Sequence, residues 1–323
     1  MKGKIAKIES RRRLMYTGIF SLLFLVYLLM SSGCSEQETS KKVILNESGV
    51  ENTGKAETPS NDTLWFGFDL RLAPKEDIKM YAPFLKYLEE ATGRHFRIKF
   101  TEKYENTLKN LGEGTTHFAA IGTLSYAIGS DMYGIKYLLS GVNQEGDPRY
   151  HAAIITAPDS KINDIKQLKG KSFCFGSRMS TQGHIIPRKM LEDAGITLKD
   201  LSHYHYTGSH VNTVSDVLKG ECDAGGIQDV LANSLASERK IKIIGLSEPY
   251  PSSIIAYNKD VDSDTVRAVK AALLAFEPGG RHKSRLHDWD KTEMPLGFTV
   301  LNEFEISRVT ALARKYELIK EQR

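Results

Sequence analysis

Four consecutive residues, Ser180 to Gly183, offer the clearest chemistry in this sequence. Residues 172–176 before them have the composition of a short buried strand, and apolar residues at helical spacing begin after them at Ile185 and stop at Gly195. A tight turn between a strand and a helix directs unpaired N–H groups and hydroxyls to one point, where the helix dipole adds partial positive charge. Such a point suits a small oxyanion. The simpler alternative is an ordinary N-cap, because serine and threonine commonly begin helices.

The elements that must position this turn form two alternating series of strands and helices. Strand-like runs of the first series cover residues 64–69, 96–100 and 117–121, and those of the second cover 173–176, 203–206, 222–227 and 241–245. Helical patterns separate them, which predicts an α/β fold with two parallel-sheet lobes. Ligands of such sheets bind at the carboxyl ends of strands, where the turn lies.

The N-terminus has the pattern of a secretion signal. Basic residues between Lys2 and Arg13 precede an apolar run over residues 14–30, and small residues follow at 31–33. The run is short and wrongly flanked for a transmembrane helix. We therefore expect an extracytoplasmic protein of the cell envelope, on the periplasmic side.

Gly33-Cys34 resembles the end of a bacterial lipobox, in which the cysteine is lipidated and becomes the mature N-terminus. Ser31 departs from the leucine that usually stands three residues before that cysteine. We expect a lipoprotein-type signal peptide over residues 1–33 and lipidation of Cys34, which would make the protein a membrane-anchored lipoprotein. An uncleaved N-terminal anchor is the alternative, and it leaves the protein on the same side of the membrane.

The charge of the chain argues against nucleic acid as a partner. Residues 1–33 carry six Lys or Arg and one Glu, a net charge of +5, whereas the whole chain is +4. The remainder is therefore about −1 and lacks the basic surplus that nucleic-acid binding requires. Residues 34–62 are polar, with few apolar residues, and are expected to form a flexible tether.

Several short motifs follow one another between residues 64 and 300. They are Ile121 to Tyr126, Gly146 to His151, Phe175 to Ser177, Ser180 to Gly183, Gly208 to His210, Gly220 to Gly225, and Ser247 to Pro249. In this order they resemble the phosphate/phosphite/phosphonate-binding proteins of ABC importers, a branch of the type II periplasmic binding proteins. The resemblance implies two lobes joined by a two-strand hinge, a ligand cleft between them, and no catalysis. We expect lobe 1 to begin with residues 63–150, lobe 2 to cover 151–248, and residues 249–323 to return to lobe 1 with C-terminal helices.

The same resemblance implies which residues hold a small phosphorus oxyanion. The residues that match the family's ligand-binding positions lie in the turn, at the start of the next helix and at two tyrosines of lobe 1. Two residues that neighbour these in sequence and one carboxylate complete the set. The expected ligand-binding residues are Tyr104, Tyr126, Tyr150, Ser177, Ser180, Thr181, Gln182, Ser209, His210 and Asp229. Hydroxyl and amide donors satisfy such an anion without a cation that would bind any anion.

Several of these residues also fit a purely structural role. Tyr104 and Tyr126 are equally consistent with half-buried packing tyrosines. Ser209 could simply cap a helix that His210 begins. Asp229 lies near the place where phosphonate binders use a carboxylate for a ligand amine, but its local match is poor.

Gln182 departs from the family pattern, which has a second serine at this position. Its side chain is larger, and its amide both donates and accepts hydrogen bonds. An acceptor beside the anion would favour a ligand that is protonated or carries a donor. Gln182 therefore leaves open whether the ligand is phosphate, phosphite, a phosphonate or another ion of that shape.

Cys174 and Cys222 fall on two predicted strands that the family places side by side in lobe 2. An exporting compartment permits a disulfide. Cysteines at paired positions of adjacent parallel strands seldom have the required geometry, so we expect two buried thiols.

Other functional classes receive less support. His203 and His205 alternate on one strand, and with His210 or Cys222 they could bind a transition metal, but no carboxylate or cysteine stands at ligand spacing. The sequence lacks the G-x-S-x-G and H-E-x-x-H motifs, so we expect no enzyme, and we expect no cofactor or metal. The expected protein is a monomer that presents its closed form to an ABC permease. Presentation to a membrane sensor kinase is the alternative.

Overall fold

The computed structural model describes residues 63–69, 74–101 and 103–319, which belong to one compact unit. The expected signal peptide over residues 1–33, the expected tether over 34–62 and the expected lipid site Cys34 lie outside the described residues. Within the described ranges, every helix is too short or too polar to cross a membrane.

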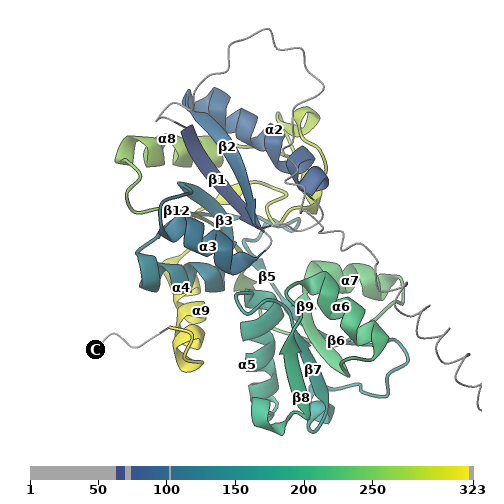
Figure 1. The fold of residues 1–323 in the computed structure, drawn as a ribbon. Coiled ribbons are helices and arrows are strands. Elements are labelled where there is room, and N and C mark those ends of the chain that lie inside the picture. The colour runs from purple at the N-terminus through teal and green to yellow at the C-terminus, as the bar shows by residue number, and fades with distance from the viewer. Residues whose placement is uncertain (1–62, 70–73, 102, 320–323) are drawn as a thin grey trace, which may run out of the picture. The chain divides into compact units, whose positions relative to one another are not determined.

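The first lobe is built on a six-stranded sheet with the strand order β13-β4-β12-β3-β1-β2 (Figure 1). Its strands are β1 (Thr63–Asp69), β2 (His95–Thr101), β3 (Phe118–Gly122), β4 (Lys136–Gly141), β12 (Ser253–Tyr257) and β13 (Phe298–Thr299). Strand β1 runs parallel to β2 and β3, whereas β12 runs antiparallel to β3 and β4.

The second lobe is built on a five-stranded sheet with the order β10-β6-β9-β7-β8. Its strands are β6 (Ala152–Thr156), β7 (Ser172–Phe175), β8 (His203–Tyr206), β9 (Ala224–Gln228) and β10 (Lys242–Leu246). Strand β7 runs parallel to β8 and β9, and β6 runs antiparallel to β9 and β10.

A short antiparallel pair, β5 (Arg149–Tyr150) and β11 (Tyr250–Pro251), links the two sheets. The expected fold class, two α/β lobes joined by a two-strand hinge, is confirmed. Both sheets are mixed because the chain enters each one through a strand that runs against the parallel set, β6 in the second lobe and β12 on the return to the first.

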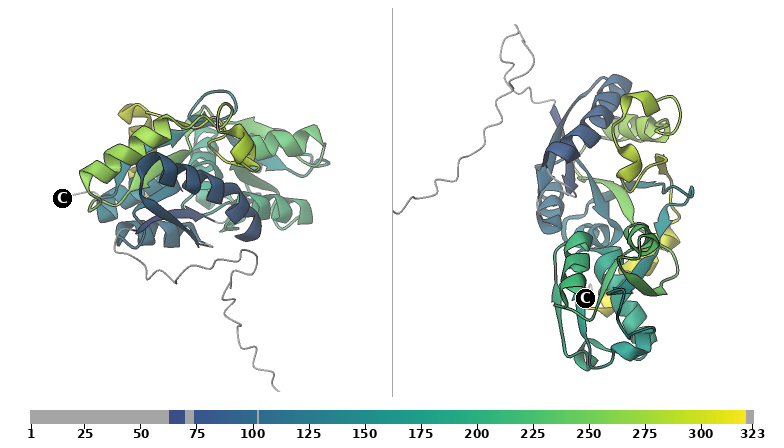
Figure 2. Two further views of the ribbon diagram at one scale, coloured as in Figure 1. Left: turned by 90° about the horizontal axis from the view of Figure 1, so that it is seen from above. Right: turned by 90° about the vertical axis from the view of Figure 1, so that its right-hand side faces the viewer.

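Helices cover the sheets, as the two views of Figure 2 show. Those beside the first sheet are α2 (Pro74–Thr92), α3 (Tyr104–Gly112), α4 (Thr123–Tyr133), α8 (Ser263–Leu274) and α9 (Glu303–Lys315). Those beside the second are α5 (Ile186–Asp193), α6 (His210–Lys219) and α7 (Asp229–Ser237). Helix α2 forms because Tyr81, Phe84 and Leu88 recur on one face and are buried, and Gly93, with φ +67°, follows its end.

The cores of the two lobes differ in character. The first lobe has an aromatic cluster in which Phe68 stacks on Tyr81 with ring centroids 4.1 Å apart, and Phe84 meets Trp289 at 5.0 Å. The second lobe is mainly aliphatic around β6 and β9, where Ile155 is fully buried. Close packing of this kind keeps each lobe rigid and leaves the linking strands as the place where movement is easiest.

Helix α9 contacts both lobes. Ile306, Val309 and Ala313 are buried on one side of it, and it packs along α4. Just beyond the helix end, the hydroxyl of Tyr316 donates a hydrogen bond to Glu192 of α5 at 3.0 Å, and Lys315 pairs with the same carboxylate at 2.6 Å. The C-terminal helix therefore spans the boundary between the first and second lobes.

The structure corrects the expectation for the cysteines. Cys174 of β7 and Cys222 form a disulfide, with Cα atoms 5.8 Å apart, so the expectation of two thiols is wrong. The reason is that Cys222 precedes β9, which pairs with β7 only from Ala224 onward. The two cysteines are therefore not opposite one another in the ladder, and their Cα separation falls in the range that disulfides adopt.

Reduction of this disulfide should destabilise the protein. The bond closes a loop with a sequence separation of 48 residues, and removal of a native disulfide of this kind costs about 2–5 kcal/mol. We expect the urea midpoint, measured in the presence of EDTA, to fall when a reductant is added. The double variant Cys174→Ser/Cys222→Ser is the control, because its midpoint should not respond to reductant. An unchanged wild-type midpoint would contradict the disulfide.

Candidate functional site

The turn that follows β7 is held in shape by its own hydroxyl groups. Ser177 Oγ accepts a hydrogen bond from the Met179 N–H at 3.2 Å, and Ser180 Oγ accepts one from the Gly183 N–H at 2.9 Å. Ser180 is thereby the N-cap of the π-helical turn η2 (Thr181–Ile185), which continues into α5. The strand, turn and helix expected from the sequence are all present, and the turn lies at the carboxyl end of β7.

Gly183 allows a close approach to this turn. A Cβ atom at Gly183 would lie 2.9 Å from Ser180 Oγ and 3.0 Å from Cε1 of His210, so a side chain here would force these neighbours to shift. The His210 ring therefore lies against the turn, at the start of α6. Ser209 Oγ caps that helix by accepting from the Asn212 N–H at 3.1 Å. The N-terminus of α6 thus lies beside that of η2.

A third helix N-terminus reaches the turn from the first lobe. Thr181 Oγ1 accepts a hydrogen bond from the Leu124 N–H at 3.0 Å, at the start of α4. The Ser125 hydroxyl donates to the Met179 carbonyl oxygen at 3.3 Å. Gly122, the N-cap residue of α4, offers no side-chain cap, so the hydroxyl from the other lobe does so.

The chemical character of this place follows from the three helix starts. Their N–H groups and dipoles converge on a turn whose side chains carry hydroxyls, and this combination favours a small anion. Thr181 is 2% exposed, and its 3.0 Å contact with the Leu124 N–H leaves no room for an oxyanion between these two atoms. An anion that uses both groups would therefore require the lobes to part.

Gln182 is bound to the linking segment. Its Nε2 donates to the carbonyl oxygens of Tyr250 and Pro251 at 3.3 and 3.4 Å, and its Oε1 accepts from the Ser252 hydroxyl at 3.1 Å. The side chain is 3% exposed. Both ends of the amide thus hold the turn to the strand that returns from lobe 2 to lobe 1.

Two expected residues lie along the linking strands. Tyr150 is buried in β5, and its hydroxyl donates to the Glu293 carbonyl oxygen at 2.8 Å. Asp229 begins α7 and accepts from the His151 N–H at 2.9 Å, and burial raises the pKa of its carboxyl. Both residues brace the places where the chain passes between the sheets.

Of the two tyrosines expected to bind the ligand from the first lobe, only Tyr126 has a side chain that the structure describes. Tyr126 packs its ring against Tyr137, with centroids 6.2 Å apart, and lines a groove of about 480 Å³ between α4 and α9. Burial raises the pKa of its phenol. Tyr104 is the first residue of α3, but its side chain lies outside the described part of the structure.

The structure adds residues to the candidate site that the sequence does not predict. Ser252 lies where the polar side chains of both lobes meet: Gln228 Nε2 donates to its hydroxyl at 3.3 Å, and its Oγ is 3.4 Å from a Glu293 carboxylate oxygen. The Leu124 N–H could have been inferred, because Gly122 to Ser125 follow a strand and begin a helix. Glu293 carries no such signal, because it lies in an irregular segment far along the chain.

His184 completes the turn as a neutral, buried ring. Its Nδ1 lies 2.7 Å from the Arg178 carbonyl oxygen and must donate, so Nε2 accepts from the Tyr206 hydroxyl at 3.0 Å. Burial lowers the pKa of His184 from 6.5 to about 4, because the charged ring would lose its hydration. The Arg178 guanidinium lies over the Tyr206 ring, 4.1 Å from its centroid.

These features define the class of protein. Type II periplasmic binding proteins have two α/β lobes, a two-strand link between them and a turn suited to an anion at the inner ends of the strands. Residues 66–299 match the family described as the periplasmic substrate-binding protein of phosphonate ABC transporters. The chain belongs to that family. It is therefore a substrate-binding component of a transporter and not an enzyme.

Individual relatives are distant. The phosphate-import protein PhnD of Mycolicibacterium smegmatis is 23% identical over 223 residues, 62% of this chain and 69% of the relative. The probable phosphite-binding protein PhnD1 of Prochlorococcus marinus is 36% identical over 84 residues, 25% of this chain and 28% of that protein.

Solved structures support the fold. The structure of PhnD1 in complex with methylphosphonate has a TM-score of 0.69 at 17% identity, covering 79% of this chain and 98% of that one. The aliphatic sulphonate binding protein SsuA of Escherichia coli has a TM-score of 0.57 at 13% identity, covering 80% and 89%.

The buried His184 ring predicts a pH dependence of stability. Above pH 6.5 the imidazole of His184 is neutral in both the native and the unfolded protein. Below pH 6.5 the imidazole of the unfolded chain takes up a proton, whereas the native ring stays neutral until about pH 4. Native stability should therefore fall as the pH falls between these values, by up to about 3 kcal/mol. Urea unfolding at several pH values measures the slope. His184→Gln should flatten it and the exposed-site control His203→Gln should not; equal slopes in all three proteins would refute this assignment.

Proposed function

We propose that the protein captures a small phosphorus oxyanion (phosphate, phosphite or a phosphonate) between its lobes and delivers it to an ABC permease. The observation that carries this proposal is the meeting of helix starts from opposite lobes at Thr181, where a hydroxyl and the Leu124 N–H lie 3.0 Å apart. Hydroxyl and N–H donors of this kind suit phosphorus oxygens. The names of the relatives, which include a phosphate importer and a probable phosphite-binding protein, support the ligand class.

Binding would proceed by movement of the lobes about β5 and β11. Opening would expose the helix start of α4 and the hydroxyls of the turn together. An oxyanion would then replace the direct contact between Thr181 and the Leu124 N–H, and closure around it would give the form that the permease recognises. Of the expected ligand residues, Ser177, Ser180, Thr181, Ser209 and His210 gather around this turn and form the proposed site.

We also propose that the protein is a lipoprotein held at the outer side of a membrane through Cys34. The support is the sequence alone: a basic segment, an apolar run and Gly33-Cys34. A polar tether over residues 34–62 would let the two lobes reach a permease while the anchor remains in the bilayer.

A thermal-shift screen against phosphate, phosphite, methylphosphonate, sulfate, an alkanesulfonate and Zn²⁺ tests the ligand class. A ligand that binds only the native state raises the melting temperature by mass action. We expect the phosphorus oxyanions to give the largest shifts. A largest shift with a sulfur oxyanion or with Zn²⁺ would refute the proposed ligand class.

Ser180→Ala and Thr181→Ala should each weaken binding of the best ligand by about ten- to a hundred-fold, since a hydrogen bond to a charged group contributes roughly 1.5–3 kcal/mol. Each hydroxyl oxygen accepts an N–H, so each O–H can still donate to an anion. Calorimetry measures the affinities. Thr197→Ala removes a hydroxyl that donates to the Asp200 carboxylate elsewhere in the same lobe and serves as the control. Native affinity in the Ser180→Ala/Thr181→Ala double variant would remove this turn from the site.

Gln182 is proposed to act through closure, because both ends of its amide hold the linking segment. Gln182→Ser removes these bonds, so it should change the affinities for all oxyanions of the panel by one common factor. Gln144→Ser, which alters an exposed amide, should leave them unchanged. A change of preference among the ligands would instead give Gln182 direct contact with the ligand.

Cys34→Ser should release the protein from membranes or leave its signal uncleaved. The physical reason is that a thioether-linked lipid requires the cysteine sulfur, which serine lacks. Membrane fractionation and incorporation of labelled palmitate measure the effect, with Ser40→Ala, in the expected tether, as the control. Equal incorporation into the Cys34→Ser protein and the wild type would refute lipidation at this residue.

A further inference from the structure

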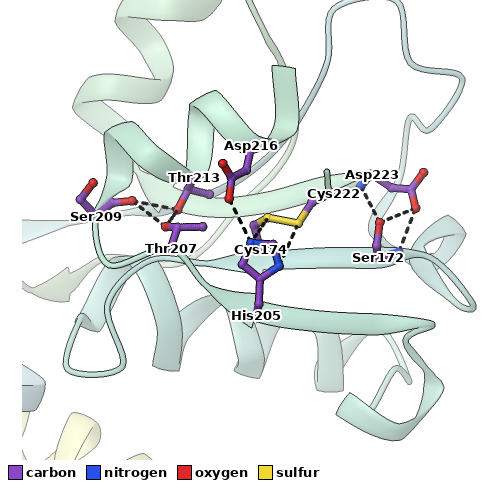
Figure 3. The surroundings of a disulfide bond; sticks show 9 residues. All are labelled: Ser172, Cys174, His205, Thr207, Ser209, Thr213, Asp216, Cys222 and Asp223. Atoms are coloured by element: carbon purple, nitrogen blue, oxygen red, sulfur yellow. Dashed lines mark hydrogen bonds and ion pairs between the residues drawn. A yellow bond between two sulfur atoms is a disulfide. The ribbon is translucent and has the colours of Figure 1, made fainter. Parts of the chain in front are cut away.

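A histidine lies directly against the disulfide of the second lobe. His205 of β8 has Nε2 3.6 Å from Cys174 Sγ and Nδ1 3.8 Å from Cys222 Sγ (Figure 3). One ligand atom from each of these three residues lies within 4.8 Å of the other two. They come from the strands β7 and β8 and from the segment before β9, so the sheet itself fixes their separation.

A carboxylate orients this histidine. Asp216 of α6 has Oδ2 3.0 Å from His205 Nε2, on the helix that covers this part of the sheet. An Nε2–H that donates to the carboxylate leaves Nδ1, which lies 3.8 Å from Cys222 Sγ, as the ring nitrogen with an available lone pair. Histidines that bind metals are commonly held in this way, by a carboxylate on the second ring nitrogen.

We propose that the dithiol form of the protein binds one thiophilic divalent cation, Zn²⁺, through Cys174 Sγ, Cys222 Sγ and His205 Nδ1. Asp216 is a positioning residue that orients the imidazole. The site shares no residue with the proposed oxyanion turn.

The donor set fits this metal. Zn²⁺ prefers thiolate and imidazole donors in tetrahedral geometry, with ligand atoms about 3.3–3.8 Å apart. The three donor atoms therefore need only small rotations once the sulfur–sulfur bond is opened. Cys174 and Cys222 are buried, whereas the His205 side chain is 41% exposed, so a cation and a fourth ligand from solvent can approach from the histidine side.

The disulfide and the cation exclude one another. A thiol reductant opens the sulfur–sulfur bond: its two thiols become a disulfide, and their hydrogens convert Cys174 and Cys222 to thiols. Zn²⁺ then displaces one proton from each thiol and accepts an electron pair from each sulfur and from the imidazole. No change in the oxidation state of the metal is required.

Cobalt titration of the reduced full chain tests this site. The protein carries Cys34→Ser, so that its two thiols are those of Cys174 and Cys222. After anaerobic reduction and removal of the reductant, we expect one Co²⁺ per chain, with thiolate-to-cobalt charge-transfer absorption that one equivalent of Zn²⁺ abolishes. The oxidised protein should show no such absorption.

Variants separate this site from adventitious binding. His205→Ala should weaken Co²⁺ binding at least tenfold, and Asp216→Asn should weaken it by about 10–100-fold, as loss of an orienting partner does elsewhere. His203→Ala is the matched control: its exposed ring lies 6.5 Å from that of His205 on the same strand, and its loss should leave the affinity unchanged. Circular dichroism of each variant shows whether it folds, and both histidine variants retain the cysteine pair.

Three results would overturn the proposal. They are the absence of charge-transfer absorption in the reduced protein, equal Zn²⁺ binding by the oxidised protein, and equal losses of affinity in His203→Ala and His205→Ala. Retention of thiolate-to-cobalt absorption after Cys174→Ser/Cys222→Ser would likewise overturn it.

Discussion

The hydrogen bond from the Leu124 N–H to Thr181 Oγ1 joins the two lobes at the place proposed for the anion. A helix start has N–H groups that its own helix cannot satisfy, and burial makes an unsatisfied donor costly. Helix α4 lacks a side-chain cap of its own, so the first lobe must obtain an acceptor from elsewhere. The second lobe supplies a threonine hydroxyl. Any anion that takes over this role must offer at least as good an acceptor, and a charged phosphorus oxygen does.

A buried polar cluster extends this dependence to the linking strands. Gln182 of the turn, Gln228 at the end of β9, and Ser252 and Glu293 of the returning chain share hydrogen bonds within 3.4 Å. Polar groups in such a cluster are costly to leave unpaired, so the turn and the returning strand tend to move as one. The place that suits the anion is thus connected to the strands about which the lobes would rotate.

The sequence predicts much of the fold because its signals are local. Apolar periodicity, the glycine that ends α2 and the alternation of strand and helix indicate the two lobes, and the small polar turn after β7 is visible without any structure. The predictions that depend on distant contacts are less complete. The sequence does not indicate that the Gln182 amide meets Tyr250 and Pro251, nearly seventy residues away along the chain. The sequence does not predict the disulfide. The position of Cys222 relative to Cys174 depends on where β9 begins, and the ends of strands are poorly determined by composition.

The C-terminal helix α9 provides a further contact between the two lobes. Helix α9 buries apolar side chains in a core cluster shared by both lobes and packs mainly along α4, and at its end Glu192 of α5 meets Lys315 and Tyr316. Exposed ion pairs contribute at most about 1 kcal/mol, much less than a buried helix face. Separation of the lobes should therefore leave α9 on α4 and pull Arg188 away from the Tyr316 ring, whose centroid lies 3.9 Å from its guanidinium. The contact between Arg188 and the Tyr316 ring is thus a marker of the arrangement of the lobes, present while they meet and lost when they part.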